Sequence, residues 1–186
     1  MSIPGSASPL LLASTAAAAG GDRSLRFNAA DTAHLNRTPA VAGDRTKWTW
    51  AAWVKRSELG RAQFMFNAGP DTANDTDQIH TYFNASDAFG INSQNTQFRI
   101  TTQVFRDVSA WYHFVIAVDT TQGTANDRIK FYVNGSQVTT FSVTANPTQN
   151  ANTGVNATTQ HTLGRAAGTQ YTSAAFSFSG YLANTH

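Results

Sequence analysis

The stretch that decides the fold lies at residues 111–141, which contain WYHFVIAVD at 111–119 and RIKFYVNGSQVTTF at 128–141. The first segment is a run of apolar and β-branched residues, and this predicts a central strand that is apolar on both faces. The second segment places Asn134–Gly135 between two strand-forming runs. Asn-Gly is the preferred pair for a two-residue type I′ turn, because both turn positions need a positive φ. The stretch therefore predicts a long central strand followed by an antiparallel hairpin.

Short strand patterns continue on both sides of this hairpin. Helix signals are scarce, since Glu58 is the only glutamate and β-branched residues, Gly, Asn and Asp are frequent. The other expected strands are 24–28, 34–38, 46–55, 63–67, 79–84, 88–91, 97–105, 162–165 and 176–182. Long loops are expected at 71–78 and 147–160. Many short strands separated by turn signals predict an all-β fold, an antiparallel β-sandwich of the jelly-roll type.

The composition excludes several classes of site. The chain has 186 residues, a length that favours one domain with a substantial core. Charged residues make up 13% of the chain, about half the usual share, and the net charge is only +2. This charge, with no run of Lys or Arg, argues against a nucleic-acid partner. Cysteine is absent, which excludes disulfides, cysteine-ligated zinc, iron–sulfur clusters and a thiol nucleophile.

The N-terminal segment differs in composition from the rest of the chain. Its prolines and the Gly20–Gly21 pair argue against a helix, and the apolar stretch at 9–19 is too short to cross a membrane. We expect an extended N-terminal arm with an Ala/Gly linker at 1–23 and a jelly-roll domain at 24–186. The alternative is a tail without structure of its own. The residues expected to anchor the arm to a partner are Ile3, Pro4, Pro9, Leu10, Leu11 and Leu12.

Several segments together resemble a known family. They are SLRFNAADTAHLNRT at 24–38, WTWAAWVKR at 48–56, the 111–119 strand, the RIKFYVNGSQV hairpin and FSGYL at 178–182. In this order they resemble the laminin-G-like, concanavalin-A-like jelly roll, and the resemblance covers residues 24–186. In that family the Gly-Tyr-Leu strand continues into further residues, whereas this sequence stops at His186. The resemblance therefore implies either a longer natural chain, which we favour, or a last strand completed by another chain.

The opening residues carry a narrower resemblance. MSIPGSASPLLL, joined by an Ala/Gly linker to such a domain, is similar to proteins encoded by marine bacteriophages. The resemblance implies a non-enzymatic structural component of the virion, such as a tail fibre, knob or surface decoration. The arm would dock to another virion protein and the jelly roll would project, as a homo-oligomer with a trimer favoured, toward a host surface glycan. The alternatives are a free lectin-like carbohydrate-binding module and a glycoside hydrolase.

The carboxylates test the hydrolase alternative. Glycoside hydrolysis needs two carboxyl groups about 5–10 Å apart across the sugar bond. Jelly-roll glucanases carry them at alternating positions of one strand, but Glu58 lies in a turn and has no second acid on its strand. Asp75 and Asp77 have the spacing but lie in a loop. We therefore expect no enzyme activity and no catalytic residue.

The same loop is the only candidate for a metal. Asp71, Asn74, Asp75 and Asp77 supply oxygen ligands at close spacing, which is chemistry that suits calcium. The loop lacks the glycine and the closing glutamate of an EF-hand. A solvated acidic loop is the favoured interpretation, so we expect no cofactor, with calcium as the alternative.

The tryptophans allow two interpretations, as core residues or as a platform for sugar rings. Trp48 and Trp50 share one parity of their strand, Trp53 has the other, and Trp111 opens the central strand. We favour the core for all four and for His113. Five further aromatic residues lie nearer to loops and are expected to be more exposed: Tyr82, Phe83, Phe89, Phe105 and Tyr171. No glycan-contacting residue is assigned.

Overall fold

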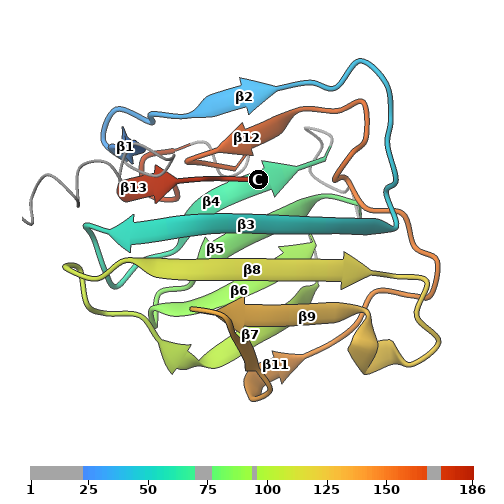
Figure 1. Cartoon of the computed structure of the whole chain (residues 1–186). Coiled ribbons are helices and arrows are strands. Elements are labelled where there is room, and N and C mark those ends of the chain that lie inside the picture. Colours follow the sequence, from blue (N-terminus) through green and yellow to red (C-terminus); the bar gives the residue numbers. More distant parts are fainter. Residues whose placement is uncertain (1–22, 70–76, 94–95, 167–172) are drawn as a thin grey trace, which may run out of the picture.

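The computed structural model describes residues 23–69, 77–93, 96–166 and 173–186. In these ranges thirteen strands form two antiparallel sheets that pack face to face (Figure 1). The six-stranded sheet has the order β1 (Ser24–Phe27), β13 (Gly180–Ala183), β3 (Lys47–Arg56), β8 (Tyr112–Asp119), β9 (Ile129–Val133), β10 (Ser136–Val138). The seven-stranded sheet has the order β11 (Phe141–Thr144), β7 (Gln97–Val104), β6 (Ala88–Ser93), β5 (Ile79–Phe83), β4 (Gln63–Ala68), β12 (His161–Leu163), β2 (Leu35–Arg37). The predicted all-β antiparallel sandwich is confirmed.

The hairpin forms where the sequence predicts it. Asn134 and Gly135 have φ values of 51° and 81°, as a type I′ turn requires, and they join β9 to β10. The second arm is shorter than expected, because β10 ends at Val138. The chain then crosses to the other sheet, where β11 pairs with β7. A short 3-10 turn, η1 (Ala125–Asp127), precedes β9.

The central strand is buried on one face only. In β8 the side chains of Phe114, Ile116 and Val118 are buried, whereas the alternate residues are half-buried. The strand is central, as predicted, and apolar Val115 and Ala117 lie on its outer face, where they are only half-buried. The residues of β5, by contrast, are buried on both faces, each with an exposed fraction of 5% or less. In Figure 1, β8 crosses the front of the sandwich and β5 lies in the layer behind it.

The core between the sheets is built largely from phenylalanine rings. The ring of Phe114 lies at centroid distances of 4.2 Å from Phe89, 4.9 Å from Phe105 and 5.7 Å from Phe83. The expectation that these three partners and Tyr82 are exposed is wrong, since each is at least 95% buried. Tyr82 and Phe83 lie in β5 and Phe89 in β6, in the middle of the seven-stranded sheet, and Phe105 directly follows β7. Nearness to a turn in the sequence does not reveal this burial. Tyr171, the fifth residue of that group, lies outside the described residues.

The Gly-Tyr-Leu strand is not an edge. All four residues of β13 pair with β1 on one side and with β3 on the other. No edge of this strand is therefore open to a second chain. The arm at 1–22 lies outside the described residues, and so do its anchoring residues. No described helix is long and apolar enough to cross a membrane.

Candidate functional site

Four aromatic rings lie together at one end of the outer face of the six-stranded sheet. Trp53 of β3 is the register partner of His113 of β8, and their ring centroids are 5.0 Å apart. The ring of Trp111, just before β8, lies 6.4 Å from that of Tyr181 in β13. We call these four residues the aromatic platform. Trp53 lies near the carboxyl end of β3, which is the arrowhead of that strand in Figure 1.

Strand periodicity explains why only some tryptophans reach this face. Trp48 and Trp50 point between the sheets and are buried, as predicted. Trp53 has the opposite parity in β3, so its side chain points outward and is 40% exposed. Trp111 is 38% exposed. The core prediction is therefore wrong for Trp53 and Trp111, because no element in the described part of the chain buries them.

His113 also belongs to the outer face. It is half-buried, and its ring contacts Trp53 instead of packing between the sheets. The prediction of a packed core histidine is therefore wrong. The parity of Trp53 in the sequence signals an outward position, but nothing in the sequence shows that this outer face is uncovered.

On the outer face of the seven-stranded sheet, by contrast, the aromatic side chains are buried. Phe64 and Tyr82 are buried there with Ile100, and Phe176 packs against them. Phe64 and Tyr82 have ring centroids 5.4 Å apart and are nearly parallel. Among the described residues, the aromatic side chains that are exposed are Trp53 and Trp111, and both lie on the six-stranded sheet, which is where a stacking ligand would find an accessible ring.

A hollow of about 550 Å³ lies between the first half of β3 and the strands β2 and β12. Trp50, Phe66 and Leu163 contribute to its lining, and Thr185 and His186 form part of one wall. We place the candidate site on the platform, because Trp53 and Trp111 present exposed aromatic rings there.

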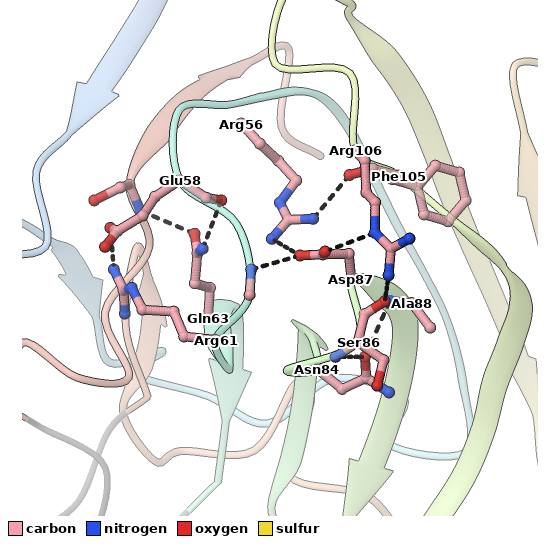
Figure 2. Close-up of polar contacts among 12 residues, drawn as sticks. Arg56, Glu58, Arg61, Gln63, Asn84, Ser86, Asp87, Ala88, Phe105 and Arg106 are labelled. Carbon is pink, nitrogen blue, oxygen red and sulfur yellow. Dashed lines mark hydrogen bonds and ion pairs between the residues drawn. The ribbon is translucent and has the colours of Figure 1, made fainter.

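A polar network contains the two acids Glu58 and Asp87 (Figure 2), and their contacts show whether either could act in sugar hydrolysis. Glu58 is 2.7 Å from Arg61 and 46% exposed. The hydrogen bond from the Arg61 guanidinium is the main cause of a lowered pKa for Glu58. A general acid at neutral pH needs a raised pKa. Glu58 is therefore ionised at neutral pH and is not suited to give a proton to a leaving group.

Asp87 is the buried acid of the same network. Its carboxylate lies 2.9 Å from Arg56 and 3.0 Å from Arg106, and it accepts a 2.8 Å hydrogen bond from the Gly60 N–H. Burial alone raises the pKa of Asp87, but these three donors together outweigh burial and leave the pKa below its usual value. Figure 2 shows the carboxylate between the two guanidinium groups, and this arrangement is structural.

Most of the candidate calcium ligands lie outside the described residues, so the structure does not test them. Asp71, Asn74 and Asp75 lie outside the described ranges, and so does the Asp75 half of the carboxylate pair with Asp77. Asp77 is 2.9 Å from Arg45, which places a cation at the candidate ligand. In the described part of the chain, no group of three or more His, Asp or Glu residues could hold a metal.

A family model matches most of the chain. A laminin G family model, described as the concanavalin A-like lectin/glucanases superfamily, matches residues 27–183. The chain belongs to this superfamily. The match confirms the resemblance stated from the sequence segments, and it covers nearly all of the domain that the structure describes. A comparison with curated protein sequences found no match.

Solved structures show the same architecture as this concanavalin A-like domain. A heptameric SAP-like pentraxin from Limulus polyphemus is 15% identical, with a TM-score of 0.56, over 90% of this chain and 72% of the pentraxin. The CBM40 of the Ruminococcus gnavus IT-sialidase, bound to α2,3-sialyllactose, is 15% identical with a TM-score of 0.55, over 83% of this chain and 91% of that chain. Domains LG4-5 of the mouse laminin α1 chain are 10% identical with a TM-score of 0.59, over 89% of this chain and 42% of the laminin chain. At these identities the likeness shows the fold alone.

Proposed function

We propose that this concanavalin A-like domain is a non-catalytic carbohydrate-binding module, displayed on a phage virion by its N-terminal arm. The observation that carries the binding function is the aromatic platform. Trp53 and Trp111 are large aromatic side chains left accessible side by side with Tyr181 and His113, whereas the other exposed large hydrophobic residues of the described chain are aliphatic. Exposed apolar groups clustered in one place mark an interaction site.

The platform suits the apolar faces of sugar rings. Flat aromatic rings cover the C–H faces of a sugar, and the polar edges of Trp, Tyr and His donate or accept hydrogen bonds from its hydroxyl groups. The platform is built on paired strands, so its rings are already in place before a ligand arrives. The CBM40 structure bound to sialyllactose supports a lectin-like role for a domain of this fold.

A non-catalytic role is supported by the chemistry of the rim. Glu58 and Asp87 are each held ionised by arginine, so the network lacks a proton donor for bond cleavage at neutral pH. The proposal of a virion component rests on the MSIPGSASPLLL resemblance and on the low-charge, cysteine-free composition. It places the protein in the particle, beside other virion proteins, as a homo-oligomer with a trimer favoured.

Replacing Trp53 by Ala is expected to weaken glycan binding about tenfold or more, because an interface aromatic that is truncated typically costs over 1.4 kcal/mol. Calorimetric titration or a glycan array with the full chain measures the change. The Trp111→Ala variant should act in the same direction. Val104→Ala is the matched control, since Val104 is 42% exposed on the other sheet. If Trp53→Ala and Val104→Ala bind every glycan alike, the platform is not the site.

Deleting residues 1–21 is expected to abolish incorporation into the particle while leaving the thermal unfolding midpoint of the domain unchanged. Burial of each leucine of the Leu10–Leu12 triplet in a partner would contribute about 1.5–3 kcal/mol. Sedimentation of particles from a complemented infection, with detection of the chain in the pellet, measures incorporation. Truncated chain that still co-sediments with particles would contradict the anchoring role.

A further inference from the structure

Two cations share a single row across the strands with two rings of the aromatic platform. Arg26 of β1 is the register partner of Tyr181 in β13, and Tyr181 is in turn the partner of Lys55 in β3. The register of β3 with β8, continued by one residue, places Trp111 opposite Lys55. The ring contact between Trp111 and Tyr181 agrees with this placement. The row therefore alternates cation, aromatic ring, cation, aromatic ring.

Neither cation has an ion-pair partner among the residues that the structure describes. Arg26 is exposed and Lys55 is half-buried. The opposite end of the same face differs, because Lys130 there lies 3.6 Å from Asp127. The unneutralised positive charge on this face therefore gathers beside the platform.

Asp107, an acid whose pKa is affected by the charge of Lys55, is already engaged. The carboxylate of Asp107 accepts hydrogen bonds from the Ser109 hydroxyl at 2.6 Å and from the Ser109 N–H at 2.8 Å. These bonds lower the pKa of Asp107, with a small contribution from the charge of Lys55. The Asp107 carboxylate is thus bound to Ser109 in its own turn and forms no ion pair with Lys55. The N–H groups of the Lys55 ammonium are therefore available to an anion of a ligand.

Building on the proposed carbohydrate-binding function, we infer that the platform binds an acidic polysaccharide. Sugar rings stack on Trp53 and Trp111, and a carboxylate or sulfate group of the polymer lies between Arg26 and Lys55. A charge-assisted hydrogen bond from a guanidinium or ammonium group is about twice as strong as a neutral one. The aromatic rings thus provide affinity for sugars in general, and the two cations select the acidic ones.

A single-stranded nucleic acid also combines rings with negative charge, but it fits this row less well. Such ligands need a positively charged groove that follows the backbone over several nucleotides. Here the unpaired charge amounts to Arg26 and Lys55, and the net charge of the chain is only +2. The row suits a polymer whose charges are spaced by sugar rings.

The test compares three polymers with the full chain: alginate as a polyuronate, laminarin as a neutral glucan, and oligothymidylate. Wild-type protein is expected to bind alginate about tenfold more tightly than laminarin at low salt, and this preference should shrink as salt screens the charges. The Arg26→Gln/Lys55→Gln variant is expected to lose the preference while its laminarin affinity stays within about twofold. Lys130→Gln is the matched control and should keep the preference.

The outcomes separate this inference from the function on which it rests. Trp53-dependent binding of laminarin and alginate with equal affinity would overturn the acidic preference and keep the carbohydrate-binding function. Folded protein that binds no polysaccharide would overturn both. Oligothymidylate bound as tightly as alginate, with the same loss in the double variant, would replace the polysaccharide with a nucleic acid.

Discussion

Replacing Asp87 by Asn is expected to lower the free energy of unfolding by about 3–5 kcal/mol, because the change leaves a buried guanidinium without its anion. The Arg56 side chain is 0% exposed and that of Asp87 is 6% exposed. Arg56 also donates a 2.8 Å hydrogen bond to the Phe105 carbonyl and lies 4.1 Å from the centre of the Phe83 ring. These contacts hold the guanidinium in place, so it cannot move out to water when its partner is lost.

Asparagine is the right replacement at this position. Asp87 has a φ of 65°, a left-handed conformation that Asn tolerates and that most other residues do not. Urea denaturation measures the change in free energy. The control is Asp127→Asn, which removes an exposed pair with Lys130 and should cost less than about 1 kcal/mol. Equal costs for the two variants would contradict the structural role of Asp87.

The same carboxylate gives the variant a distinctive pH profile. The folded-state pKa of Asp87 is lowered, so its contribution is fully present above the unfolded value of about 3.9 and is lost as pH falls through the folded value. Wild-type stability should therefore drop as the pH is lowered below about 4. The Asp87→Asn variant should lose less stability over that window, since its side chain does not titrate. The Arg56→Met/Asp87→Asn double variant should recover part of the stability lost at neutral pH, because it also removes the buried charge.

Replacing Gly164 by Ala is expected to cost about 2–5 kcal/mol, from overpacking together with backbone strain. A Cβ atom at this position would lie 2.2 Å from the ring of Phe27 and 2.8 Å from the Ala33 carbonyl oxygen. Phe27 is only 4% exposed and packs against Phe178, so its ring has no room to move aside. Gly164 also has a φ of 91°, where a side chain is disfavoured in any case.

Gly123 provides the matched control for this change. Nothing lies within 4 Å of a Cβ built there, so Gly123→Ala should change the free energy of unfolding by no more than about 0.5 kcal/mol. Thermal unfolding of both variants beside the wild type measures the difference. A Gly164→Ala variant as stable as Gly123→Ala would show that the Gly164 turn can relax away from Phe27.

The sequence alone predicted the fold class and most of the strands, because these depend on local patterns. The parity of its tryptophans marked β3, and Asn134–Gly135 marked the hairpin. The crossing from β10 to β11 was missed, because a strand that changes sheets keeps the same local pattern on both sides of the crossing. The role of Asp87 was also missed, since its arginine partners lie 31 and 19 residues away in the chain.

What the sequence determined about the candidate site is the parity of its residues. Alternation in β3 already separates Trp53 from Trp48 and Trp50. Parity shows which residues share a face, but it does not show whether another element covers that face. Only the tertiary structure decided this, by burying both faces of β5 and leaving one end of the β3–β8 face open, where Trp53 and Trp111 meet solvent. Coverage depends on how distant segments pack, and this is why the exposure of these aromatic residues could not be predicted from their neighbours in the chain.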